Sequence, residues 1–208
     1  MSKRYLFPLL AVCGLLLTGC FPQFEQPASD PALAQQDLDL HGLWVHQQSE
    51  AGLQYLHIGG ESEKPLDANR EEPELGLMRL IYSSYDAKSR KLGGPLTFRF
   101  FASHVGDVTI ANLVLPFEGS TETGPTTFWL MKYRVTGNQL ETWTMNNDAA
   151  AQAVETGALR GIVEREGRRI KRVLISDSSE NVATFLAQGG HTRLFPDDQK
   201  TVYQRVNP

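Results

Sequence analysis

Apolar side chains recur at every second position in several stretches of this chain, and this two-residue period limits its possible folds. In residues 96–103, Phe98 and Phe100 would share the buried face of a strand, whereas Phe101 and Ser103 would share the opposite face. Turn residues separate stretches of this kind. Strands are predicted at 43–46, 53–58, 77–85, 96–103, 108–115, 127–135, 139–145, 159–164, 170–176 and 201–206. Strand follows strand without alternating helices, which excludes a parallel α/β fold.

Two short helices are predicted in the C-terminal half. Residues 147–156 begin with Asn and Asp capping candidates and stop at Gly157. A second helix begins at Asp177, has Glu180 three residues later as in a capping box, and ends at Gly189. The sequence therefore predicts a mainly β fold: an antiparallel barrel, or a barrel-like sandwich, of 8–10 strands with two short helices.

The first twenty residues have the pattern of an export signal. Lys3 and Arg4 precede an apolar run of thirteen residues, 5–17. A run of about 10–14 apolar residues is too short to span a bilayer as a helix and fits the core of a signal peptide. The run ends in Leu17-Thr18-Gly19-Cys20, where small residues before a cysteine would let the backbone enter a peptidase groove.

This ending resembles the lipobox of bacterial lipoprotein precursors. The resemblance implies cleavage before Cys20 and acylation of that residue, for example with palmitate, and two or more chains give stable membrane anchoring. Residues 1–19 would be a signal peptide, 20–37 the lipidated cysteine with a flexible, proline-rich tether, and 38–208 a single β-rich domain. Phe21 rather than Asp after the cysteine implies the periplasmic face of the outer membrane, if the organism has one.

The cysteine count and the charge narrow the possible chemistry. Cys13 and Cys20 are the two cysteines, so a mature chain would have no disulfide and no free thiol. Removing Lys3 and Arg4 leaves 18 basic residues against 24 acidic ones, a net charge of −6. An acidic chain without a long basic tract argues against a nucleic-acid partner and against electrostatic attachment to anionic lipid.

Gly42-Leu43-Trp44, at the first predicted strand of the domain, resembles the G-x-W motif that opens lipocalin-type barrels. In that family a basic residue from the last strand packs over the tryptophan and closes the barrel end. The resemblance implies this structural role for Arg205 over Trp44, with a cation–π contribution of about 0.5–1 kcal/mol or more. The family's other motifs are not recognisable here.

Three features are candidates for function. The loop 59–73 is long, polar and mostly acidic, and the hairpin tip 165–172 is basic. Disorder at a barrel rim is the alternative explanation for the loop, and a solvated turn is the alternative for the tip. Inward-facing aromatic side chains could either line an apolar ligand cavity or fill the core. The candidate ligand-binding residues are Phe98, Phe100, Trp129 and Tyr133.

No catalytic motif is recognisable in the sequence. Ser103, His104 and Asp107 lie in or beside a predicted tight turn, which explains them better than a nucleophile set does. The five histidines do not have metal-ligand spacing. We therefore expect no catalytic residue, metal or cofactor.

The leading hypothesis is a non-enzymatic envelope lipoprotein, held to a membrane by lipid on Cys20, that acts as a binding or interaction module. Its partner would be another envelope protein. The alternatives are a lipocalin-like carrier of an apolar small molecule and a hydrolase without a recognisable motif.

Overall fold

The computed structural model describes residues 21–48, 52–60, 76–116 and 124–206. Cys20, the predicted signal segment 1–19 and most of the acidic loop predicted at 59–73 lie outside the described residues. No helix among the described residues is long and apolar enough to cross a bilayer.

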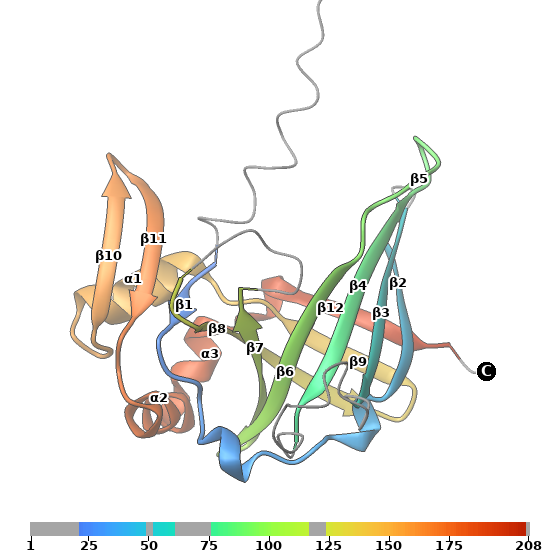
Figure 1. The fold of residues 1–208 in the computed structure, drawn as a ribbon. Helices are drawn as coiled ribbons and strands as arrows, with labels where there is room; N and C mark the ends of the chain where they lie inside the picture. Colours follow the sequence, from blue (N-terminus) through green and yellow to red (C-terminus); the bar gives the residue numbers. More distant parts are fainter. Residues whose placement is uncertain (1–20, 49–51, 61–75, 117–123, 207–208) are drawn as a thin grey trace, which may run out of the picture.

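Eight antiparallel strands close into a barrel, which confirms the predicted mainly β class (Figure 1). Each strand pairs with the next in the order β8-β7-β6-β4-β3-β2-β12-β9, and β9 pairs with β8 again. The barrel strands are β2 (Gly42–Gln48), β3 (Gly52–Gly60), β4 (Met78–Asp86), β6 (Leu96–Val105), β7 (Val108–Leu115), β8 (Thr127–Thr136), β9 (Gln139–Trp143) and β12 (Lys200–Arg205). The two-residue strand β5 (Lys91–Leu92) pairs with the end of β4.

Inward-facing side chains fill the barrel. Phe98 and Phe100 on β6 are 5% and 3% exposed, as their alternation predicts. Phe101 and Ser103, expected on the opposite and more exposed face, are buried as well, at 3% and 2% exposure. The reason is that residues 21–41 cover this face of β6, where Phe101 packs with Ala34 and the Ser103 hydroxyl is hydrogen-bonded to Ser29.

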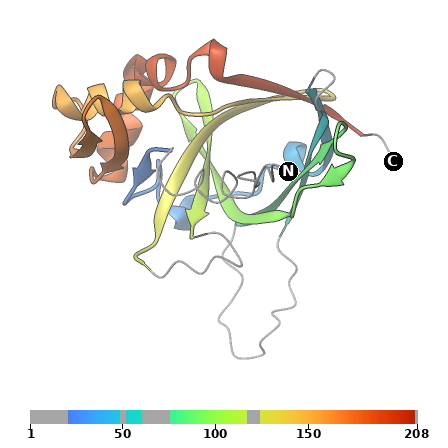
Figure 2. The ribbon, with the colours of Figure 1, turned by 90° about the horizontal axis from the view of Figure 1, so that it is seen from above.

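A second layer is formed by the C-terminal helices and an extra hairpin, which lie outside the barrel to one side (Figure 2). Their apolar residues pack with Ile110, Leu130 and Trp143, whose strands belong to the barrel. The two predicted helices form, and a π-helical turn at Leu186–Gly190 joins the second to a short third one. The elements are α1 (Asn147–Glu155), β10 (Gly161–Glu166), β11 (Arg169–Ile175), α2 (Ser179–Phe185) and α3 (His191–Leu194).

Residues 21–41, here called the N-terminal arm, pack against the barrel. The prediction of a flexible tether over residues 20–37 is therefore wrong for its described part. Strand β1 (Gln23–Phe24) pairs with both β8 and β11, and Phe24 is fully buried. The backbone N–H of Ala28 donates to Oδ1 of the buried Asn112 on β7 at 2.8 Å. The arm's proline-rich composition suggested a tether, but its apolar residues cover the outer face of the barrel.

The end of the arm crosses one end of the barrel, here called the closed end. It contains two short 3-10 turns, at Pro31–Leu33 and Leu38–Leu40. Leu40 packs with the barrel interior, and the Tyr133 hydroxyl donates to Asp37 at 2.8 Å. At the same end the Nε1–H of the fully buried Trp44 donates to the Leu40 carbonyl at 2.8 Å.

Arg205 joins the last strand to this closed end. Its guanidinium lies 4.1 Å from the centroid of the Trp44 ring and donates to the carbonyl oxygens of His41 and Asp39.

We predict that Arg205→Met lowers the free energy of unfolding by about 2–3 kcal/mol, because it removes two charge-assisted hydrogen bonds and a cation–π contact. Urea unfolding should show a lower midpoint with an unchanged slope. Arg168→Met, in an exposed turn, should change the stability by less than about 0.5 kcal/mol; equal losses in both variants would contradict this role.

Candidate functional site

The four aromatic residues proposed as ligand-binding from sequence belong to the apolar cluster inside the barrel. Phe98, Phe100 and Tyr133 are buried there, and Trp129 is partly buried. The cavity lined by Phe100 and Tyr133 measures about 20 Å³, roughly the space of one water molecule. Within the described part of the chain these aromatics fill a core and leave no room for a lipid-sized ligand.

Trp129 also makes contact with the beginning of the N-terminal arm. The Phe21 ring lies 5.1 Å from the Trp129 ring, and Phe98 lies 6.0 Å from Trp129 on the barrel interior side. Both Trp129 and Phe98 lie near the starts of their strands, at the end of the barrel opposite the closed end. The arm therefore starts at the open end and finishes across the closed end.

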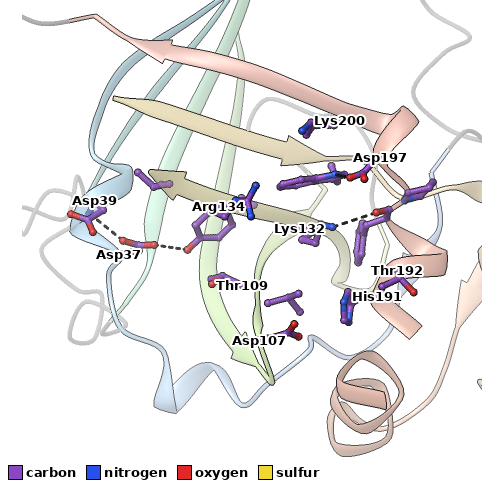
Figure 3. A pocket seen from close by; sticks show the side chains of 16 residues that line it. Asp37, Asp39, Asp107, Thr109, Lys132, Arg134, His191, Thr192, Asp197 and Lys200 are labelled. Carbon is purple, nitrogen blue, oxygen red and sulfur yellow. Dashed lines mark hydrogen bonds between the residues drawn. The ribbon is translucent and has the colours of Figure 1, made fainter. Parts of the chain in front are cut away.

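A larger groove lies outside the barrel, between the closed end and the C-terminal helices (Figure 3). Its volume is about 630 Å³. Charged side chains from the arm, the barrel and the second layer line it, so residues distant in sequence meet here. The lining residues are Asp37, Asp39, Asp107, Val108, Thr109, Lys132, Tyr133, Arg134, Val135, Trp143, His191, Thr192, Phe195, Pro196, Asp197 and Lys200.

Trp143, the last residue of β9, organises the basic half of this groove. Strand register places Lys132 of β8 on one side of it and Lys200 of β12 on the other. The Lys132 ammonium lies 4.0 Å from the centroid of the Trp143 ring, and the Lys200 ammonium lies 5.7 Å away. On the edge of the indole, Nε1–H donates to Asp197 at 3.1 Å. A buried ring thus holds cations on its face and a carboxylate at its edge.

Lys132 differs from the other cations of the groove because no described carboxylate forms an ion pair with it. Its ammonium donates to the Phe195 carbonyl at 3.4 Å (Figure 3). Burial lowers the pKa of Lys132, Asp197 opposes this shift, and the nearby Arg134 charge adds to it. A partly desolvated cation without a matching anion is suited to receive an anionic group from a ligand.

Glu141 neutralises the other two cations. Its side chain, 11% exposed, accepts from Arg134 Nε at 2.8 Å and from Lys200 Nζ at 3.1 Å. Burial alone would raise the pKa of Glu141, but the bonds from Arg134 and Lys200 outweigh it and hold the pKa below its usual value. This fixed network leaves Lys132 as the available charge.

The opposite half of the groove is acidic. Asp37 and Asp39 come from the N-terminal arm, and Asp107 comes from the turn between β6 and β7 (Figure 3). Asp37 is bound to the Tyr133 hydroxyl, and burial together with this bond raises the pKa of Tyr133. The groove is therefore dipolar, with carboxylates at one end and cations over Trp143 at the other.

The residues weighed as a nucleophile set do not form one. The Ser103 hydroxyl is buried between Ser29 and Asn112, where it supports the packing of the arm. The exposed His104 contacts Thr109 across the β6–β7 hairpin, with its Nδ1 3.3 Å from Thr109 Oγ1. Among the described residues, no group of three His, Cys, Asp or Glu side chains is arranged to hold a metal ion.

Sequence reasoning missed the groove. Its key residues, Lys132, Trp143 and Lys200, become neighbours only through the pairing of three strands, of which the last is far along the chain. The outward position of Lys132 on its strand was visible in the alternation of residues 127–135. The alternation did not reveal the strand register that places Trp143 beside Lys132.

No protein-family model, curated protein or solved structure matches this chain. A barrel shape alone does not identify a function, so the likeness of Gly42-x-Trp44 to lipocalins stays a prediction.

The Glu141 network gives a testable pH dependence. A carboxylate whose pKa is lowered on folding stabilises the protein above its unfolded pKa of about 4.3, and this contribution disappears as the pH falls through the folded value. Glu141→Gln should cost about 1 kcal/mol at neutral pH and make stability less steep in pH below about 5. Urea unfolding across this range measures it. Glu166→Gln, at an exposed ion pair, serves as the control; matching profiles for the two variants would rule out the network.

Proposed function

We propose that this protein is a lipid-anchored, non-enzymatic binding module of the bacterial cell envelope, which holds its partner outside the barrel in the groove over Trp143. The observation that supports this best is the contrast between two spaces. The barrel interior offers about 20 Å³, whereas the outer groove offers about 630 Å³ and is lined by charged side chains. A carrier of apolar ligands needs a large space inside the barrel, whereas a module that binds polar partners needs a large groove on the outside.

Lys132 suggests the chemistry of the partner. Its ammonium lacks an ion pair among the described residues and opens onto the groove, while Arg134 and Lys200 are held by Glu141. An anionic side chain of an envelope protein would pair with Lys132, and basic groups of the same partner would meet Asp37, Asp39 and Asp107. The groove thus favours a partner that carries both charges along an extended surface.

The anchoring part of the proposal rests on the lipobox-like residues 17–20. With acyl chains on Cys20, the protein would reside on a membrane, and Phe21 at the next position favours the periplasmic face of the outer membrane in a diderm organism.

Anchoring is tested directly in cells. Cys20→Ser removes the thiol that would be acylated, so palmitate labelling should be lost and the precursor should not be cleaved before residue 20. Gly19→Ala keeps a small residue beside the cut and should leave both events intact. Labelling with radioactive or alkynyl palmitate, followed by mass determination of the N-terminus, gives the answer. Normal maturation of the Cys20→Ser variant would exclude the anchor.

The groove is tested by photocrosslinking in cells. A benzophenone amino acid at Thr192, an exposed lining residue, should give a defined adduct, whereas the same probe at Ile81 on β4, across the barrel from β9, should not. Lys132→Met should reduce the Thr192 adduct about tenfold, the effect of losing roughly 1.4 kcal/mol of pairing, and Lys132→Arg should restore it. A yield of the Thr192 adduct that does not depend on the charge at position 132 would argue against binding through this groove.

A further inference from the structure

Two hairpin tips collect a large part of the chain's positive charge. The β4–β5 tip, residues 86–92, has three basic residues and one acidic residue. The β10–β11 tip, residues 164–172, has five basic and two acidic residues. Together they contain eight of the 20 lysines and arginines of a chain whose net charge is −4. The charge of this protein is therefore unevenly distributed.

The acidic residues within the tips do not cancel this excess. Asp86 accepts bonds within its own turn, from the backbone of Lys88 and from Ser89. In the other tip, Lys171–Glu166 and Arg172–Glu164 are exposed contacts of 3.5 and 3.6 Å, of the kind that contributes little. Among the described residues, Lys88, Arg90, Lys91, Arg168 and Arg169 form no ion pair.

Both tips project in the same direction, and the N-terminal arm begins between them (Figures 1 and 2). Strand pairing supports this arrangement on one side, because β1 runs parallel to β11 and so starts toward the β10–β11 tip. On the other side, β4 ends at its tip while β6 runs from there toward the closed end. The basic tips thus flank the start of the packed arm at the open end of the barrel.

The packed arm leaves little chain between Cys20 and the domain. Three residue steps separate Cys20 from Gln23, the first residue of β1, and they span at most about 11 Å. If Cys20 carries lipid, as proposed above, the tips are held close to the headgroup region. Here the net charge of the whole chain matters less than the local charge, because salt screens interactions beyond roughly 8–10 Å.

The β4–β5 tip has two features that a solvated turn does not require. Leu92, beside Lys91, is 74% exposed. Arg90 occupies the left-handed region with φ 56°, where Gly or Asn is the usual residue and a bulky side chain is strained. An exposed leucine among three cations is a suitable combination for an interface between lipid headgroups and water.

We infer that the two basic tips form a membrane-contacting face that binds anionic lipid headgroups and fixes the orientation of the domain on the bilayer. The inference rests on the proposed anchor, which brings the face to the membrane, and it adds a second attachment whose strength depends on the charge of the lipid headgroups. It also revises the expectation, drawn from net charge alone, that the domain has no electrostatic affinity for anionic lipid.

The test uses the mature lipoprotein purified from membranes and reconstituted into vesicles. Its cysteines are Cys13, in the signal segment, and Cys20, so an introduced cysteine provides a single site for a fluorophore. Labels are attached at Leu92→Cys and Arg168→Cys in the tips, and at Asp107→Cys near the closed end as the matched control. Quenching by doxyl-labelled lipids reports contact with the bilayer, and vesicle flotation reports anchoring.

In vesicles with about 30% phosphatidylglycerol at low salt, we expect both tip labels to be quenched at least about threefold more than the Asp107→Cys label. The difference should shrink in phosphatidylcholine vesicles and at about 0.5 M salt. A variant with Lys88→Glu, Arg90→Glu and Lys91→Glu should lose quenching at position 168 as well, with an unchanged melting temperature. Arg90→Gly separates contact from folding, because it relieves the strained backbone and should raise the melting temperature while weakening the contact.

Three results would overturn the inference: equal quenching of tip and control labels, quenching that is independent of lipid charge, or full contact in the triple Glu variant. The first would also be expected if the tips bind an acidic protein and not lipid. Vesicle flotation at high salt tests the anchor separately from the inference, because acyl chains stay inserted in the bilayer at high salt whereas an electrostatic contact is weakened. A protein that fails to float at about 0.5 M salt would refute the anchor, and flotation with anionic vesicles at low salt would then decide the inference alone.

Discussion

The barrel depends on a short seam between its first and last strands. Only two residue pairs join β12 to β2, Gln204 with Val45 and Arg205 with Trp44, so backbone bonds alone hold this junction weakly. Side chains complete it: the Arg205 guanidinium covers the Trp44 ring and binds two carbonyl groups of the arm. One residue thereby connects the last strand, the first barrel strand and the segment across the closed end.

One edge of strand β8 pairs with β7 of the barrel, whereas its other edge has two different partners along its length. Its C-terminal half pairs with β9 and closes the barrel, whereas Phe128 near its start pairs with β1 of the arm. Strand β9 therefore pairs with β8 only from Lys132 onward, and the edge of β8 between Phe128 and Lys132 faces neither β1 nor β9 as a paired strand. The groove lies beside this point, and its lining combines residues of the arm, the barrel strands and the second layer, which explains why they come from distant parts of the chain.

Local patterns were enough to predict the fold class, and long-range contacts explain what they missed. Alternation in 96–103 and 127–135 located strands correctly, because a two-residue period reports which face is buried. The same alternation placed Phe101 on the more exposed face, since it contains no information about the arm that covers it. The apolar Phe24 within a proline-rich stretch was a signal against a free tether. The groove required the register of β8, β9 and β12, which no local pattern specifies.

The two proposed contact regions lie at opposite ends of the barrel, and the charge distribution suggests why. The basic tips lie at the open end, and Asp37, Asp39 and Asp107 lie at the closed end. Outside the tips, the chain has 12 basic residues against 21 acidic ones, so the molecule has a strong charge asymmetry. On an anionic bilayer, as proposed, the basic end would be attracted and the acidic end repelled, which would turn the groove away from the membrane. A partner could then enter the groove without passing between the domain and the lipid, so anchoring and binding need not compete.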